Sequence, residues 1–424
     1  MSAILTRTRL AYLGIIVLLL LVGVFQSWSV ALVMINLCLI SAVMALGVNI
    51  QWGYAGLFSA GTVGFVALGG LAGVLISEAP VIEAWDVGGA GLIYSVATLA
   101  ALIAAIFIIM SVMKPGTARR IVMTCVILGG YFAVRYFFDP ATDAIEGVNP
   151  SAQGFLGGLG LPILLSWPVG GLLAALVAWG IGKVALGLRS DYLAIATLGI
   201  AEIVIAVIKN EDWLARGVKN VSGLARPMPK EIALQESPEF IGWIEWLHSG
   251  ALSTVTGDER IQMLRDFAQQ DAGTFVKLIY MLLFTVVLLI LFALAQRALN
   301  SPWGRMMRAI RDNEVAAEAM GKNVTKRHLQ TFILGSAVVG IAGAMLTTLD
   351  GQFTPGTYNP LRFTFLVWVM VIVGGSGNNH GSVIGGFLIW FAWVQAEPAG
   401  ILLMDGLTFF MAPDNPVRLH LLDA

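Results

Sequence analysis

The sequence predicts an all-α fold, a polytopic helical bundle that crosses a membrane about 10 or 11 times, judged by the length of its apolar runs. Hydrophobic residues make up 58% of the 424 residues, charged residues only 12%, and the mean hydropathy is +0.83. This composition excludes a soluble protein. The apolar residues are also gathered into long runs with short charged segments between them. The net charge of −1 gives no sign of nucleic-acid binding.

The first apolar run, residues 11–25, follows Arg7 and Arg9 and resembles a signal sequence in outline. No small-residue cleavage site follows it, so we expect an uncleaved first span with its N-terminus in the cytoplasm. The other runs of spanning or near-spanning length are residues 29–48, 61–77, 89–113, 121–138, 165–188, 192–208, 275–296, 329–349, 363–375 and 382–398.

Charge in the connecting segments alternates, as the positive-inside rule requires if about 11 spans are correct. Residues 78–86 and 139–146 hold acidic residues and no Lys or Arg, so they are predicted outside. The long connection 210–273 has six basic against ten acidic residues and is also predicted outside. Its Trp243–Leu247 stretch suggests a helix lying at the membrane interface. The basic residues that mark the inside are Lys114, Arg119, Arg120, Lys183, Arg189 and those of segment 301–328.

The chain is thereby divided into four regions. Residues 1–209 form an N-terminal membrane bundle and residues 210–273 an outside region. Residues 274–403 form a C-terminal membrane bundle that includes the inside segment 301–328, and residues 404–424 form a tail.

Segment 301–328 is charged, basic in balance and predicted to be helical. Ser301 can cap a helix with Pro302 at its first position, and Gly321 can end one in the left-handed conformation. Asp312 and Asn313 mark a break between two short helices. Met and Ala residues give the segment an apolar side that could seat in another protein's groove. A solvated loop that obeys the positive-inside rule is the alternative interpretation.

Two stretches, residues 49–59 and 373–381, place polar residues and glycines beside apolar runs. Non-helical backbone at membrane depth survives only where protein or water satisfies it, so such breaks often line a permeation path. Plain turns are the alternative, and packing against neighbouring helices is the ordinary role of most glycines in these runs. The candidates for a translocation path are Asn49, Gln51, Tyr54, Ser59, Thr197, Glu202, Gly374 and Gly375.

Glu202 lies in the middle of run 192–208, where an unpaired carboxylate is unfavourable. We therefore expect its side chain to face the bundle interior or a cavity, as a functional group or as one member of a pair.

No enzymatic constellation is visible. The four histidines form no pair at helical spacing, and no Ser/His/Asp or HExxH arrangement occurs, so neither a catalytic site nor a metal site is predicted. Gly182-Lys183 and Gly321-Lys322 both lack the remainder of a phosphate-binding loop. If ATP drives this protein, another chain hydrolyses it.

Four blocks carry a family resemblance. NIQWGYAGLFSAGTVGFVALGG, LRSDYLAIATLGIAEIV, SPWGRMMRAIRDNEVAAEAMGKNVTKRHLQTFILGSAVVGIAGAM and VMVIVGGSGNNHGSVIGG are similar to signature blocks of LivM-type permeases. Those permeases are inner-membrane subunits of branched-chain amino-acid ABC importers. The blocks follow the family's order and extend from Asn49 to Gly386.

The resemblance implies a permease subunit that pairs with a second, related permease, two cytosolic ATPase subunits and a periplasmic binding protein. ATP and Mg²⁺ would be used by the ATPase subunits, with no cofactor bound by this chain. Ala316, Ala317 and Gly321 match the importer docking motif E-A-A-x-x-x-G, although Val315 occupies the acidic position and Glu314 lies one residue early. The implied docking residues are Arg305, Arg308, Ile310, Arg311, Glu314, Ala316, Ala317 and Gly321.

The sequence also departs from the family. Residues 89–150 and the outside connection are larger than its usual pattern, and similar proteins continue beyond RLHLLDA, so we expect a longer natural C-terminus. A permease for urea or short amides is the alternative within related importers. An ion-coupled carrier that uses Glu202 would predict several intramembrane carboxylates, and a membrane-embedded transferase would predict clustered catalytic polar residues. The sequence shows neither feature.

Overall fold

The structure, a computed structural model, describes residues 2–150, 153–187 and 190–408. Within these residues nine helices are long and apolar enough to cross a membrane, and Thr62–Ser77 and Leu361–Gly374 are shorter apolar helices. The predicted all-α membrane bundle is confirmed, and each predicted run overlaps one of these helices. Residues 409–424, most of the predicted tail, lie outside the described part of the chain.

The helices of the bundle follow the chain in order, and short helices and turns connect them. The long and spanning helices are α1 (Ser2–Phe25), α2 (Trp28–Val48), α3 (Thr62–Ser77), α4 (Ile82–Val112), α5 (Thr117–Gly147), α6 (Ser166–Ala185), α7 (Ser190–Asn210), α12 (Asp258–Asn300), α15 (Val324–Asp350), α16 (Leu366–Gly374) and α17 (Asn379–Leu407). The short elements are η1 (Asn49–Gly53), η2 (Ile163–Leu165), α8 (Asp212–Ala215), η3 (Gly217–Lys219), β1 (Val221–Ser222), α9 (Glu231–Glu236), α10 (Pro238–Leu247), α11 (Ser249–Leu252), α13 (Pro302–Asp312), α14 (Glu314–Ala319), β2 (Gln352–Phe353), η4 (Pro355–Thr357) and η5 (Leu361–Phe365).

Glycines bring the central helices α3, α6 and α15 into close contact. A Cβ added to Gly69 would overlap the carbonyl oxygen of Gly340, and one added to Gly340 would overlap that of Gly170. Gly374 and Gly381 approach each other in the same way between α16 and α17. The packing role expected for these small residues is therefore confirmed, since backbones this close leave no room for a side chain.

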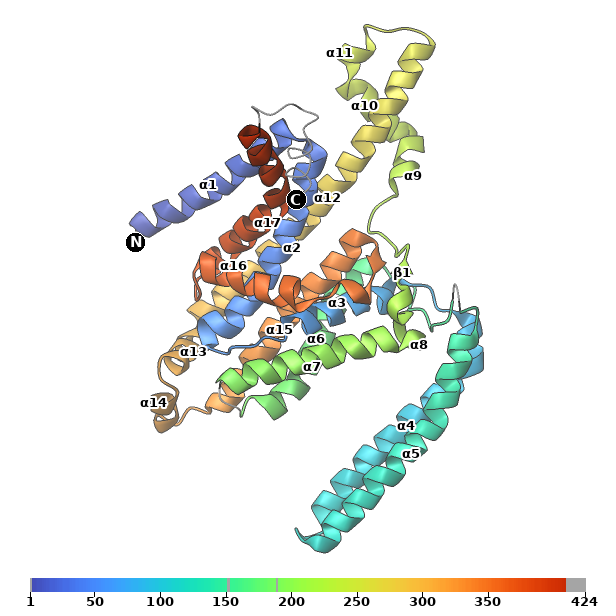
Figure 1. The fold of residues 1–424 in the computed structure, drawn as a ribbon, viewed down its shortest axis with the longest axis vertical. Coiled ribbons are helices and arrows are strands. Elements are labelled where there is room, and N and C mark those ends of the chain that lie inside the picture. The colour runs from blue at the N-terminus through green and yellow to red at the C-terminus, as the bar shows by residue number, and fades with distance from the viewer. Residues whose placement is uncertain (1, 151–152, 188–189, 409–424) are drawn as a thin grey trace.

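Helices α4 and α5 form an antiparallel hairpin that projects away from the other spanning helices (Figure 1). Gly91 of α4 packs against Ala141 of α5, and each of the two helices makes most of its contacts with the other. The hairpin meets the remaining structure at its outer end, where the rings of Phe138 and Trp213 lie edge to face at 5.6 Å. Its long apolar flanks are otherwise exposed, as suits helices surrounded by lipid.

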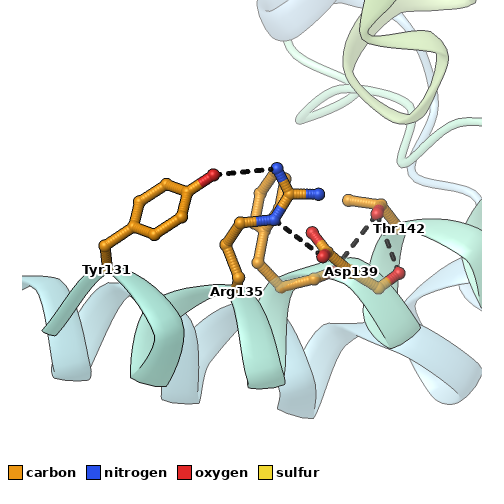
Figure 2. A network of polar contacts seen from close by, with 5 residues as sticks. Tyr131, Arg135, Asp139 and Thr142 are labelled. Carbon is orange, nitrogen blue, oxygen red and sulfur yellow. Dashed lines mark hydrogen bonds and ion pairs between the residues drawn. The ribbon is translucent and has the colours of Figure 1, made fainter. Parts of the chain in front are cut away.

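Near this outer end, polar side chains form a chain of contacts on α5 (Figure 2). The Arg135 Nε donates a hydrogen bond to the Asp139 carboxylate at 2.8 Å, and its Nη1 donates to the Tyr131 hydroxyl at 3.4 Å. Arg135 lies near the end of the apolar run 121–138, and its pairing with the partly exposed Asp139 suits a long side chain that reaches the membrane interface.

Helix α12 has 43 residues, about 65 Å at the usual helical rise, so it extends well beyond a bilayer. The region 210–273 folds against this extension, with α10 and α11 beside its outer part (Figure 1). Phe240 contacts Phe275 and His248 contacts Asp271, so α10 runs antiparallel to α12. The predicted helix at Trp243–Leu247 is present as part of α10 and packs along α12, and its position at the membrane interface stays a prediction.

The segments that connect the membrane helices fall into two groups by their contacts. One group lies on the predicted outer side of the membrane and the other on the predicted inner side. On the predicted outer side, β1 pairs antiparallel with β2 and so joins region 210–273 to the turn after α15. On the predicted inner side, α13 contacts η1. These contacts are in line with the predicted alternation of sides, and both the alternation and the assignment of the inner side to the cytoplasm stay predictions.

Candidate functional site

The inner segment folds as two short helices, α13 and α14, with the break where the sequence predicts it. Pro302 occupies the first turn of α13, and the Asn313 side chain caps α14 by accepting a hydrogen bond from the Ala316 N–H at 3.0 Å. Gly321 has a φ of +76°, the left-handed conformation expected for it. The Ser301 hydroxyl makes no cap and donates to the Ala298 carbonyl instead, so that part of the prediction was wrong.

The apolar side of α13 is turned toward the protein's own bundle. Met307 and Ile310 have no exposed surface, and Ala317 of α14 is 9% exposed. Val315 and Met320, in contrast, are 77% and 79% exposed. The surface that a partner could contact is therefore α14 and the turn after it, and Ile310 and Ala317 lie beneath that surface.

Two of the predicted docking arginines hold α13 to the end of α12. The Arg305 Nη1 donates to the Asn300 carbonyl at 3.2 Å and the Arg308 Nη2 donates to the Leu299 carbonyl at 3.3 Å. The Glu314 carboxylate lies 3.7 Å from Nε2 of the buried His328, beyond hydrogen-bonding distance. Glu314 therefore lies beside its own chain, whereas Glu318 is exposed on α14.

Arg311 links α13 to both breaks in the membrane helices. Its Nη1 donates a hydrogen bond to the Gly53 carbonyl at the end of η1, and a Cβ on Gly377 would come within 3.0 Å of the same guanidinium group and of that carbonyl. Gly377 itself donates to the Asn49 side chain at 2.8 Å. Residues 49–59 and 373–381, which are far apart in the sequence, thus meet at one place beside α13.

A buried amide chain continues from this place into the bundle. The Asn49 Nδ2 donates to Asn379 at 3.1 Å, and Asn379 donates to the Gln296 side chain at 2.9 Å. Gln51 donates to the Ser336 hydroxyl at 2.9 Å. Amide side chains fit this role because each offers donors and an acceptor to satisfy helix backbone and neighbours.

The remaining path candidates, apart from Gly375, are packed inside the bundle. The Ser59 carbonyl accepts a hydrogen bond from the Trp368 indole at 3.1 Å, and the Thr197 hydroxyl accepts one from the Ala60 N–H at 3.0 Å. Tyr54 is 8% exposed, and Gly374 packs on Gly381. Gly375 ends α16 with a φ of +95° and is exposed. In this conformation the other four residues act as internal contacts, and a role of any of the five in translocation stays a prediction.

The expectation for Glu202 was wrong. It lies on the exposed side of α7, because Ala201 and Ile205 fill the side that packs on the bundle. The sequence did not predict that Arg311, Gly53, Gly377 and Asn379 lie together. It showed only that polar residues occur in both breaks, and nothing in it indicated that the two breaks are in contact.

The sequence profile of one family, the permease component of branched-chain amino acid transport systems, matches residues 151–401. The chain belongs to this family. This permease match includes α13, α14 and the second break, while the α4–α5 hairpin precedes it.

The individual proteins to which the chain is similar are also permeases. The chain is 27% identical to the LivM permease protein of a high-affinity branched-chain amino acid transport system from Salmonella typhimurium over 230 residues, 54% of this chain and 50% of the relative. It is 27% identical to the probable LivM of Methanocaldococcus jannaschii over 274 residues, 64% of this chain and 65% of the relative. The probable LivH of that organism is 30% identical over 143 residues, 34% of this chain and 44% of the relative. The chain thus spans 50% to 65% of the length of the two LivM relatives, and no solved structure matches it.

Proposed function

We propose that this chain is a permease subunit of an ATP-driven importer in the cell inner membrane. It would pass branched-chain or other small apolar amino acids from a periplasmic binding protein to the cytoplasm. Family membership supports this assignment, and the observation that carries the mechanism is the contact of Arg311 with the Gly53 carbonyl. That contact connects an exposed inner helix pair to the two breaks in the membrane helices.

The proposed mechanism is alternating access. Two ATPase subunits bind ATP and Mg²⁺ in this mechanism. One of them would bind α14 and the turn after it, where Val315 and Met320 are exposed. Arg305 and Arg308 fasten α13 to α12, so a displacement of α14 would move α13 and the end of α12 together. Arg311 would carry that displacement to Gly53 and Gly377, and so to the helices that flank both breaks. A second, related permease subunit would complete the path.

An ion-coupled carrier has less support, because Glu202 is exposed on α7 instead of lying in the bundle interior. A coupling carboxylate needs a defined route for its ion, which an outer face of a single chain does not supply.

The test is uptake into proteoliposomes that hold the whole complex, with ATP inside and no ion gradient. Radiolabelled leucine, urea and acetamide are supplied in parallel with the binding protein. We expect ATP-dependent uptake of leucine, while ATP-dependent uptake of urea or acetamide alone would reassign the substrate. Uptake that needs a proton or sodium gradient and ignores ATP would overturn the proposed function.

A further inference from the structure

Glu202 has an unusual position for a carboxylate in a spanning helix. It lies about 18 Å from the start of α7 and about 12 Å from its end, at the usual rise of a helix. The side chain is exposed, and within the described part of the chain it makes no hydrogen bond or ion pair. Lys277, by comparison, is near the end of its apolar run and donates to the Ser29 hydroxyl.

The carboxylate shares its face with residues that leave the helix backbone accessible. Gly199 and Ala206 are exposed on the same side of α7, one turn before and one turn after Glu202, with Ile195 further along. A Cβ added to Gly199 would meet nothing within 4 Å. The opposite side of α7 packs on α3 and α6. This face is therefore both free and shaped for close approach by another helix.

Lipid cannot satisfy the hydrogen-bonding needs of the Glu202 carboxylate. Acyl chains carry no hydrogen-bond donor, and a Glu side chain is too short to reach headgroups more than about 10 Å away along the helix. A protein helix can supply a donor or a positive charge at this depth, and mid-membrane charges in proteins are ordinarily paired in that way.

We propose that the outward face of α7, defined by Ile195, Gly199, Glu202 and Ala206, is the surface on which the second permease subunit packs, with a hydrogen-bond donor or cation of that subunit opposite Glu202. The inference rests on the proposed function. Charge complementarity calls for a partner helix, and the chain is similar to both LivM and LivH of one organism, two permeases of the same kind. The occupant is therefore a related permease chain.

The first test uses a photo-crosslinking amino acid in the assembled complex. Benzoylphenylalanine replaces Ile195 in one variant and Ala206 in another, and Ile16 of α1, an exposed apolar residue in another span, is the matched control. We expect irradiation to join the Ile195 and Ala206 variants to the second permease, identified by mass spectrometry, and to leave the Ile16 variant unlinked. Products with lipid alone, or with a second copy of this chain, overturn the proposal.

The second test compares Glu202→Leu with Glu202→Gln in co-purification with the second permease. Gln keeps the size and a hydrogen-bonding oxygen, so we expect it to retain most of the partner, whereas Leu should lose at least half of it. Full retention by the Leu variant contradicts the proposal. Two further measurements on the wild-type complex distinguish a wrong interface from a wrong function. If only the interface is wrong, wild type still holds the ATPase subunits and takes up substrate with ATP. If the proposed function is wrong, wild type shows neither.

Discussion

At the scale of single residues, Arg311 makes the contact through which the inner helices reach the membrane breaks. Hydrogen bonds from a charged donor contribute about 1.5 to 3 kcal/mol, so Arg311→Ala should lower ATP-dependent uptake about 10-fold or more. ATPase subunits should still co-purify, because the exposed surface of α14 is unchanged. Arg327→Ala is the control, since its Nη1 donates to Gln330 within the same helix, α15, and takes no part in the proposed coupling. Equal loss of uptake in the two variants would refute a special role for Arg311.

Gly53 permits the close approach of the two breaks. An added Cβ would overlap the Asn49 side chain and the Gly377 nitrogen. Gly53→Ala should therefore destabilise the folded protein by about 1 to 3 kcal/mol, as overpacking of a tight contact usually does. Thermal unfolding in detergent is the measurement, and Gly129→Ala on α5, where a Cβ meets nothing within 4 Å, should leave the midpoint unchanged. Similar midpoints for both variants would mean that the contact is loose.

At the scale of elements, α14 and the turn after it form the exposed surface on which we propose that an ATPase subunit docks. Ala316→Glu adds a bulky charge between Val315 and Met320 without touching the cap that Asn313 makes with the backbone. We expect uptake to fall at least about 10-fold and ATPase co-purification to fall with it, because a buried unpaired charge opposes association. The chain should remain in the membrane.

Thr117→Glu, at the inner tip of the α4–α5 hairpin, is the matched control for that experiment. It adds the same charge to an exposed inner position far from α14. ATPase subunits that remain in full amount with Ala316→Glu would show that docking occurs elsewhere.

The existence and order of the helices could be predicted, because a run of apolar residues near 20 long has few alternatives to a spanning helix. Which face of each helix packs inward could not be predicted. On α7 nearly every residue is apolar or small, so no hydrophobic stripe tells the face that packs inward from the face of Glu202. For the same reason the sequence could not show that Ile310 is buried or that the α4–α5 hairpin stands apart from the other helices, because apolar side chains can pack equally well against protein or against lipid.

The candidate site was predicted as separate pieces. Asn49, Gly374 and the arginines of segment 301–328 were each identified from local composition, whereas the contacts of Arg311 with Gly53 and of Asn49 with Gly377 join residues more than two hundred positions apart. Such pairings depend on how the whole bundle closes, and a single sequence contains no signal for them.

At the scale of the whole molecule, the two groups of connecting segments predict the protein's orientation. In a Cys125→Ser background, Ser253→Cys in the outer region should react with an impermeant thiol reagent added to intact cells. Asn323→Cys, between α14 and α15, should react only after the cells are permeabilised. Labelling in the reverse pattern would place α13 and α14 outside and would contradict the docking role.

The α4–α5 hairpin gives the protein a sensitivity to bilayer thickness. The apolar run of α4, residues 89–113, has 25 residues and is about 37 Å long, whereas the hydrocarbon core is about 30 Å thick, so α4 has to tilt to match it. Helix α5, whose apolar run of 18 residues is about 27 Å long, packs along α4 and tilts with it. Its attachment lies at the outer end, near Phe138 and Trp213. A thinner membrane would increase the tilt and turn that attachment against the outer loops, and a thicker one would relax it. The lipid composition of the membrane thereby has a mechanical route to the loops on the predicted outer side.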